Sequence, residues 1–491
     1  MKRTLVVLPL VASLFVGCQS SGPKKEAFRR PADARELVMG SRTILNELTN
    51  PQVFNASTCA AYVNKVTDYL FALPGHHFIP KTPGEVDELK THGEETIDTI
   101  FQIRVTLGEK LKEFDARNEL TTECQQKIRE GFQYSRFAEE YLLEWLFANK
   151  NYEFKKTPIM ANSKPNTWTN PKYANYDLKT GDVMLIRGKS YVSAMIARIS
   201  DEEANFSHLA IIGEDKTGKK YVVEALIQHG VIVTPLEKWR DQEDARVALY
   251  RQKDAALGQL AGRKMYETAK AALDKGSAIP YDFAMEDKDH SAVFCSEVVS
   301  WAYEMASDNS YIIPKFRSSI SKFKNSNYPR SLGLLSSTLF SPHDIEVDPR
   351  FELVAEYRFY PLLRQVRMQD TVLQSIYSWI IEKNYEFYWS PTHSVKTFLG
   401  KFIRQFGFMG DKLPKYMPMS TLKTTLQFEN VANALEENIY AKEKAFYQAK
   451  GYLPSPAEML QWHEEYRRAD CALGPNSKFH YYFHTKSNSC E

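Results

Sequence analysis

The chain has 491 residues, of which 43% are hydrophobic and 13% aromatic. This length corresponds to about three folding units, and the apolar content is sufficient for packed cores, so extensive disorder is excluded. The 63 basic and 61 acidic side chains leave a formal net charge of +2. A protein that binds nucleic acid normally has a clear basic excess, so no nucleic-acid partner is expected. No apolar run reaches the roughly 20 residues that cross a bilayer, which excludes a polytopic membrane protein.

The N-terminus has the pattern of an export signal. Met1-Lys2-Arg3 is basic and residues 4–16 are apolar, a combination typical of a secretory signal peptide. The stretch ends in Phe-Val-Gly-Cys, which resembles a bacterial lipobox and implies cleavage before Cys18 and acylation of that residue. Gln19 follows in place of Asp, which by similarity to bacterial lipoproteins implies the outer membrane. We expect a lipid anchor on Cys18 that holds the chain at the periplasmic face, with an ordinary secreted protein as the alternative.

Six cysteines constrain the covalent structure. If Cys18 carries lipid, five remain in an oxidising compartment, and an odd number leaves at least one free thiol. The local pairing joins Cys59 to Cys124 and Cys471 to Cys490, and it leaves Cys295 free. Four cysteines permit three pairings, so the sequence favours this one without deciding among them.

The region before residue 155 is predicted to be helical. Apolar residues recur at steps of three and four between Ile100 and Phe114, which indicates one long amphipathic helix. A second helical pattern extends over 122–148. Long helices with few strand signals favour an antiparallel bundle or a long helical hairpin. Residues 155–175 are rich in Pro, Asn, Thr and Lys and indicate a linker.

The middle third has an α+β pattern. Short β-branched runs separated by turns predict strands. They occur at 183–186, 208–212, 221–226, 231–234 and 246–250. Helices are predicted over 255–275 and 294–305, and a further strand near 351–357. After residue 360 the helical periodicity returns.

The predicted hairpin formed by 208–212 and 221–226 places a histidine near a glutamate. If the turn is centred on Lys216, His208 lies directly opposite Glu224 on one face of the sheet. Opposed Cβ atoms are about 4.5–5.5 Å apart, within reach of an imidazole–carboxylate hydrogen bond. A register shift of one residue would place the two side chains on opposite faces.

Cys295 is predicted to lie in the first turns of a helix. Ser291 or Asp289 is a suitable N-cap, and the residues after Cys295 carry one apolar stripe. The helix dipole and the free amides there favour a thiolate. A thiolate beside an imidazole that a carboxylate orients is the general form of an activated nucleophile. The alternatives are an inert buried thiol at Cys295 and a structural role for His208, and His290 is a competing base.

Five short segments occur in a recognisable order. They are Leu178-Lys179-Thr180-Gly181-Asp182-Val183, Ser207-His208, Val223-Glu224-Ala225, Pro280-Tyr281-Asp282-Phe283 and Phe294-Cys295-Ser296-Glu297. Together they resemble the circularly permuted NlpC/P60, papain-like amidases of the YiiX/YaeF type, in which the His-bearing strand precedes the Cys-bearing helix. The resemblance implies an α+β fold: a permuted papain-like (NlpC/P60) central domain with an antiparallel sheet, flanked by N-terminal and C-terminal all-helical regions.

The resemblance also implies roles for individual residues. The expected set is Cys295 as nucleophile, His208 as base, Glu224 as the group that orients His208, and Tyr281 as a substrate-binding residue. No cofactor or metal is expected, since no Cys/His set has zinc-ligand spacing. The predicted boundaries are a lipoprotein signal peptide over 1–17, a tether over 18–31, a helical region over 32–154, a linker over 155–175, the cysteine hydrolase domain over 176–358 and a C-terminal helical region over 359–491.

Three functions are compatible with these features. The first is a cell-envelope cysteine hydrolase that cleaves an amide bond, with peptidoglycan peptides as the expected substrate. The second is an acyltransferase or lipid/ester hydrolase similar to the lecithin–retinol acyltransferase group. A lipid acyl substrate requires an apolar channel beside Cys295, whereas a peptide requires a polar, open groove. The third is a non-catalytic envelope scaffold, which the complete Cys/His/Glu set disfavours.

Overall fold

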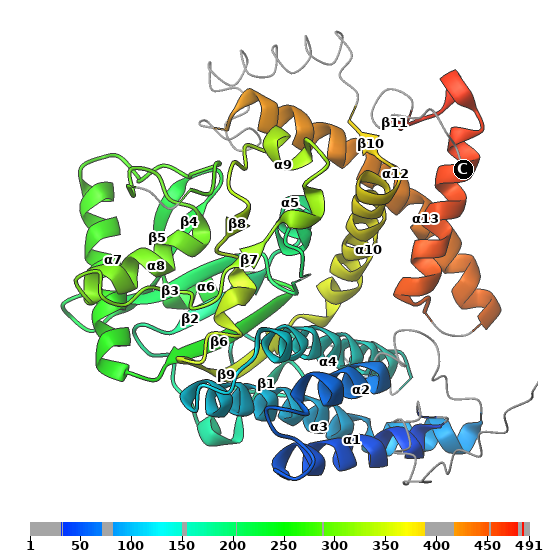
Figure 1. Ribbon diagram of the computed structural model, residues 1–491, viewed down its shortest axis with the longest axis horizontal. Helices are drawn as coiled ribbons and strands as arrows, with labels where there is room; N and C mark the ends of the chain where they lie inside the picture. The colour runs from blue at the N-terminus through cyan, green and yellow to red at the C-terminus, as the bar shows by residue number, and fades with distance from the viewer. Residues whose placement is uncertain are drawn as a thin grey trace, which may run out of the picture.

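The computed structural model describes residues 31, 33–70, 82–149, 155–202, 204–286, 289–387, 417–450, 453–479 and 484–485. The predicted signal peptide, Cys18 and Cys490 lie outside these residues. Figure 1 shows the N-terminal helices in blue and cyan below a green sheet region, with the C-terminal helices in orange and red beside it. Within the described ranges, no helix combines the length and the apolarity that crossing a membrane requires.

The described part of the N-terminal region consists of four helices. They are α1 (Ala34–Thr49), α2 (Cys59–Leu70), α3 (Pro83–Ala116) and α4 (Thr122–Asn149). α3 contacts both α1 and α4, and α2 packs on α4, so the region is a helical bundle. α3 buries Ile100, Ile103 and Leu107 completely, because residues three and four apart share one helix face.

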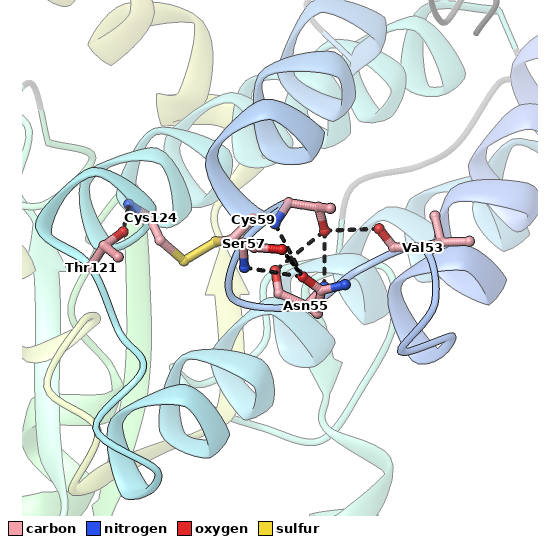
Figure 2. Close-up of a disulfide and its surroundings, with 7 residues drawn as sticks. Val53, Asn55, Ser57, Cys59, Thr121 and Cys124 are labelled. Atoms are coloured by element: carbon pink, nitrogen blue, oxygen red, sulfur yellow. Dashed lines mark hydrogen bonds between the residues drawn. A yellow bond between two sulfur atoms is a disulfide. The ribbon is translucent and has the colours of Figure 1, made fainter. Parts of the chain in front are cut away.

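A disulfide joins the start of α2 to the start of α4 (Figure 2). It links Cys59 to Cys124, whose Cα atoms are 5.4 Å apart. The Asn55 carboxamide oxygen accepts hydrogen bonds from two backbone N–H groups of the turn before α2. Thr121 accepts a hydrogen bond from the N–H of Cys124 and caps α4. Both ends of the bond are therefore held by local hydrogen bonds.

Of the other two described cysteines, one is disulfide-bonded and one is a free thiol. Cys471 is also disulfide-bonded, and Cys490, its expected partner, lies outside the described residues. Cys295 is the one free cysteine of the part of the chain that the structure describes, and it is buried.

The central region is built on a seven-stranded antiparallel sheet in the order β1-β9-β6-β2-β3-β4-β5. The strands are β1 (Thr167–Thr169), β2 (Val183–Arg187), β3 (His208–Glu214), β4 (Lys220–Leu226), β5 (Gly230–Pro235), β6 (Arg246–Gln252) and β9 (Phe351–Arg358). Helices α7 (Ala255–Asp274) and α8 (Cys295–Ala306) pack against β3 and β4. This region is therefore α+β, as predicted.

Short elements complete the central region. They are α5 (Tyr191–Arg198), α6 (Leu236–Arg240), α9 (Tyr328–Ser331), β7 (Ser318–Ser319), β8 (Thr338–Leu339) and the 3-10 helices η1 (Pro171–Tyr173), η2 (Ser321–Phe323) and η3 (Pro342–Ile345). The two-residue strands β7 and β8 pair with each other.

The segment over 155–175, predicted as a linker, is part of the folded region. It contributes β1, which pairs with β9 at the edge of the sheet with Thr167 opposite Tyr357. Trp168 is almost completely buried there, and the Asn170 side chain donates a hydrogen bond to the carbonyl of Leu353. A three-residue strand is too short to show an alternating pattern, so the Pro- and Asn-rich composition concealed it.

The hairpin of β3 and β4 has a different register from the predicted one. Ile211 pairs with Val223, which centres the turn on Thr217 rather than Lys216. The Asp215 carboxylate accepts hydrogen bonds from the N–H groups of Thr217 and Lys219, and Gly218 adopts φ +85°, which fixes the position of this turn. His208 is therefore not directly opposite Glu224. The two residues are diagonal neighbours on the same face, because the register moved by two positions and not by one.

The C-terminal region packs against the rest of the molecule. Its elements are α10 (Tyr360–Glu382), α12 (Met419–Lys450), α13 (Pro456–Cys471), the 3-10 helix η4 (Gly474–Asn476) and the strand pair β10 (Tyr385–Glu386) and β11 (His484–Thr485). α10 contacts α4, α5, α12 and α13. Met368 of α10 and Phe428 of α12 are buried in one apolar cluster.

Buried ion pairs join the N-terminal bundle to the sheet. Glu356 of β9 accepts hydrogen bonds from Arg104 of α3 at 2.7 Å and from Arg136 of α4 at 2.7 Å. Arg358 lies 3.1 Å from the same carboxylate, and Arg104 also binds both oxygens of Glu139. All five side chains are at most 3% exposed. Burial raises the pKa of Glu356, but the charges and hydrogen bonds of Arg104 and Arg136 outweigh burial and hold it below its usual range.

A second set of buried pairs links α10 to the same sheet. Asp370 of α10 receives a hydrogen bond from Arg187 of β2 at 2.9 Å and lies 3.3 Å from Arg198 of α5. Arg246 of β6 forms a two-point pair with Glu140 of α4. The sheet is therefore joined to α4 and to α10 by buried ion pairs.

Removal of the α2–α4 disulfide tests the N-terminal bundle. The double variant Cys59→Ser with Cys124→Ser should have a free energy of unfolding lower by about 4 kcal/mol. The bond closes a loop with a sequence separation of 65, and opening it restores chain entropy to the unfolded state. Chemical denaturation followed by circular dichroism measures the change, and a midpoint equal to that of the wild type would contradict it.

The Glu356 cluster makes a second stability prediction. Glu356→Gln should destabilise the protein by about 3–5 kcal/mol, because it leaves buried guanidinium groups without a carboxylate. Glu95→Gln, on the exposed face of α3 opposite Arg42, is the matched control and should leave the denaturation midpoint unchanged. Equal midpoints for the two variants would show that the buried cluster does not hold the bundle to the sheet.

Candidate active site

β3 begins at His208, whose ring reaches the side chain of Glu224 on β4. The imidazole Nε2 lies 2.7 Å from Oε2 of Glu224. The Glu224 side chain is 6% exposed and the His208 side chain 17%, so a buried carboxylate orients a ring that keeps access to a cavity. Because Nε2 is engaged by Glu224, Nδ1 is the ring nitrogen left for Cys295.

Cys295 is the first residue of α8, with Phe294 at the N-cap position. The expected N-caps are wrong, because Asp289 instead accepts hydrogen bonds from the N–H and the hydroxyl of Ser291 in a local turn. The helix therefore starts at Cys295, later than an N-cap at Asp289 or Ser291 would place it. Its first amides have no acceptor within the helix, and the sulfur lies among them. That position stabilises a thiolate.

The thiol and the imidazole perturb each other in opposite directions. Burial raises the pKa of Cys295, but a hydrogen bond to His208 and the charge of that ring outweigh burial and leave the pKa below its ordinary value. The backbone N–H of Leu209 and the Ser296 hydroxyl act in the same direction. Burial lowers the pKa of His208, yet the hydrogen bonds to Cys295 and Glu224 raise it to about 10. The contact between the two side chains therefore favours the thiolate–imidazolium pair over the neutral thiol and imidazole.

Tyr281 lies against the sulfur from a neighbouring segment. Its backbone forms a bridge with Val293, two residues before Cys295, and the Val293 N–H donates to the Pro280 carbonyl at 2.9 Å. Burial first, and then the negative charge and a hydrogen bond at Cys295, raise the pKa of Tyr281 well above its usual value. The phenol therefore stays protonated, so it is available as a hydrogen-bond donor at the reacting centre.

His290, the competing base, is engaged elsewhere. Its Nδ1 lies 2.8 Å from Glu297 Oε1 and its Nε2 3.1 Å from Glu304 Oε2. The ring stacks on Trp301 with centroids 4.7 Å apart. Both nitrogens are occupied by carboxylates of α8, so this histidine holds the loop before the helix.

A cavity of about 400 Å³ opens beside the Cys295–His208–Glu224 chain, and Tyr281 lines it as well. The residues after β2, helix α5 and strand β4 form three of its sides. Asp244, Leu426 and Glu429 also line it, and the sequence gave no reason to expect them there. Leu426 and Glu429 belong to α12, more than one hundred residues after Cys295. No local motif marks such residues, because only the packing of α12 brings them to the cavity.

A second, smaller cavity of about 70 Å³ adjoins the first and shares Tyr281, Ile227 and Met417 with it. Its lining is almost entirely apolar. Further residues on its wall are Met195, Ile199, Phe283, Leu332 and Leu334. The site therefore has a polar chamber at the sulfur and an apolar chamber beyond Tyr281. Within the residues that the structure describes, no group of three or more His, Cys, Asp or Glu side chains is arranged to hold a metal ion.

The antiparallel sheet, the His-bearing strand and the later Cys-bearing helix define a papain-like domain with permuted element order. Residues 177–341 match the model of a family described as "Permuted papain-like amidase enzyme, YaeF/YiiX, C92 family". The central segment of the chain is therefore similar to that family, whose description is that of a papain-like amidase, and the match does not extend over the helical regions on either side.

A solved structure titled "Crystal structure of metalloprotein yiiX from Escherichia coli O157:H7, DUF1105" is 20% identical, over 36% of this chain and 97% of that chain, with a TM-score of 0.27. No curated protein matches the chain.

The electrostatics of the site predict how Cys295 reacts with iodoacetamide. Because its pKa is lowered, the thiolate persists as the pH falls below the ordinary value of about 8.5. Alkylation of the wild type should therefore remain fast at pH 7 and decline only at lower pH. His208→Ala removes the main stabilising partner and should move the midpoint of the pH–rate curve upward by more than one pH unit.

Peptide mapping by mass spectrometry identifies Cys295 as the alkylated residue. The control is Ser300→Ala, which should keep the wild-type pH–rate curve. Ser300 lies further along α8, where its hydroxyl donates a hydrogen bond to the Glu297 carbonyl. A His208→Ala curve that overlays the wild type would mean that the ring does not stabilise the thiolate.

Proposed function

We propose that this protein is a cysteine hydrolase of the cell envelope that cleaves an amide bond by acyl transfer, with a peptidoglycan peptide as substrate. The observation that carries the proposal is the chain of contacts from the Cys295 sulfur through His208 to Glu224. A thiolate, an imidazolium and an orienting carboxylate are the groups that nucleophilic amide cleavage requires.

The chemistry follows from the positions of these groups. The Cys295 thiolate attacks the amide carbonyl and forms a carbon–sulfur bond, which places negative charge on the carbonyl oxygen. The free amides at the start of α8 and the Tyr281 hydroxyl are the donors nearest to that charge. As the carbon–nitrogen bond breaks, the His208 imidazolium gives its proton to the leaving nitrogen. Neutral His208 then takes a proton from water, which attacks the thioester and releases the carboxylic acid and the thiolate.

Glu224 acts through His208. Its carboxylate keeps Nε2 occupied, so that Nδ1 faces the sulfur, and it stabilises the imidazolium that the first step needs. In this role Glu224 is a positioning residue whose removal slows both steps without removing the nucleophile.

The envelope location is supported by two features of the chain. The first 18 residues have the pattern of a lipoprotein signal, and the disulfide between Cys59 and Cys124 is of a kind that persists in oxidising compartments. A lipid anchor on Cys18 would keep the cavity at the membrane surface, within reach of the periplasmic peptidoglycan.

A second candidate function is favoured by the apolar chamber beyond Tyr281. A substrate with a lipid acyl chain needs such a channel next to the nucleophile, and the thioester chemistry at Cys295 is the same for an ester or an acyl transfer. The volume of about 70 Å³ is small beside the roughly 300–1,000 Å³ of pockets that hold a whole drug-sized ligand. A short acyl group or an aliphatic amino-acid side chain therefore fits the described space, which keeps peptide cleavage as the first candidate.

The substrate class is tested by incubating the full mature chain with purified peptidoglycan and, separately, with phospholipid vesicles. Mass spectrometry of the products should show new free amines and carboxylates from peptidoglycan peptides. Cys295→Ala should reduce product to the uncatalysed background and change the free energy of unfolding by no more than about 1 kcal/mol. Release of fatty acid from the vesicles, with no change in peptidoglycan, would favour the second candidate.

Ser300→Ala is the matched control in this experiment also, and it should retain wild-type turnover. A Cys295→Ala variant as active as the wild type on either substrate would remove the thiol from the mechanism. A large loss of stability in Cys295→Ala would instead indicate that the thiol is a packing group of α8.

A further inference from the structure

The Cys295 cavity has an unbalanced charge. Three carboxyl groups line it, those of Glu224, Asp244 and Glu429, and no lysine or arginine is among the described residues of its wall. The carboxylate of Glu224 is paired with the His208 ring. The same ring also forms a hydrogen bond with Cys295. The positive charge of His208 therefore offsets the negative charges of Cys295 and Glu224 only in part. Asp244 and Glu429 add further negative charge, which no side chain of the described wall neutralises.

Asp244 lies just before β6 on the sheet side of the cavity. It makes no hydrogen bond or ion pair with any part of the chain that the structure describes, although Lys189 and His208 are close enough to act on it through space. Burial first, and then the charge of Glu224, raise its pKa to about 7. A carboxyl group with this environment gains free energy when a cation enters the cavity beside it.

Glu429 lines the same cavity from α12, far from Asp244 in the sequence. Burial is the one cause that raises its pKa, and it too has no hydrogen bond or ion pair within the described ranges. Neighbouring residues of α12 that line the cavity are Leu426 and Thr425, which are uncharged. Glu429 is thus a second acidic group that is turned toward the chamber and left without a counter-charge.

We infer that the cavity binds a substrate with an ammonium group close to the scissile amide, and that Asp244 and Glu429 are the specificity residues that receive this group. The inference rests on the proposed function, because it places the cation next to a bond that Cys295 attacks. Charge-assisted hydrogen bonds from an ammonium to two carboxylates are strong in a site from which water is partly excluded. The adjoining apolar chamber takes the uncharged part of the same molecule.

This assignment makes the C-terminal region part of the site. The family match ends at residue 341, whereas Glu429 and the apolar residues beside it lie on α12. Recognition of the cation is therefore shared between the permuted papain-like domain and a helix outside the matched segment. An anionic substrate group would meet carboxyl groups on both sides and would be rejected.

The experiment uses protection of the thiol, which needs no knowledge of the natural substrate. The full mature chain is treated with iodoacetamide at pH 7.5 in the presence of hexylammonium, hexanol or hexanoate, and alkylation of Cys295 is followed by peptide mass spectrometry. Hexylammonium should slow alkylation at concentrations about tenfold lower than hexanol, which has the same chain without the charge. Hexanoate should protect least of the three.

Two variants assign the effect to the proposed residues. Asp244→Asn and Glu429→Gln should each bring the protecting concentration of hexylammonium close to that of hexanol, which corresponds to a loss of about tenfold. Glu437→Gln is the control on the same helix, because the Glu437 side chain is 76% exposed and points to Lys478, and it should keep the wild-type preference. Circular dichroism verifies that each variant is folded, and the two acidic positions give independent readings if one variant is unstable.

The outcomes separate this inference from the proposed function. Equal protection by hexylammonium and hexanol in the wild type would overturn the cation site while leaving the Cys295 chemistry intact. A preference for hexylammonium that survives in both variants would overturn the assignment to Asp244 and Glu429. The proposed function fails on different evidence, namely amide hydrolysis that does not depend on Cys295.

Discussion

The contact on which the architecture depends is the buried group of arginines around Glu356. Arg104 and Arg136 come from the N-terminal helices and Arg358 from the same strand as the carboxylate. Charges in this environment are costly unless all of them are paired, so the bundle cannot leave the sheet without exposing or orphaning them. Asp370 ties α10 to β2 in the same way. The helical regions are therefore structural parts of the catalytic domain and not appended modules.

The rigid sheet has a direct consequence for the site. His208 and Glu224 lie on adjacent strands, and Cys295 begins a helix that packs on those strands. Their separation is set by strand spacing and helix packing, which gives the sulfur–imidazole contact a fixed geometry. α12 reaches the open side of the same cavity. In the proposed function, the papain-like segment thus supplies the catalytic groups, and in the inferred cation site the C-terminal helices supply part of the substrate contact.

Much of this could be predicted from residues close together in sequence. The strands of the middle third and the helices that carry Cys295 and Ile100 follow from local periodicity, because side chains on one element obey its repeat. The pairing of Cys59 with Cys124 was favoured as the local solution, and the structure confirms it. The predicted direct opposition of His208 and Glu224 was wrong in detail, since the turn is centred on Thr217 and not on Lys216. The two side chains still lie on the same face of the sheet, because the register differs from the predicted one by two residues and not by one. A shared face is what allows the two side chains to meet.

The amino-acid sequence by itself determined the element types, the α+β class of the centre and the candidates for the reactive residues, all of which depend on local pattern or on motif order. Tertiary structure alone decided that Trp168 belongs to an edge strand, that Arg104 and Glu356 meet across 252 positions, and that Asp244 and Glu429 face one cavity. The physical reason is that such contacts are selected by the burial of whole surfaces. Periodicity within one element reports which face is buried but not which distant element covers it.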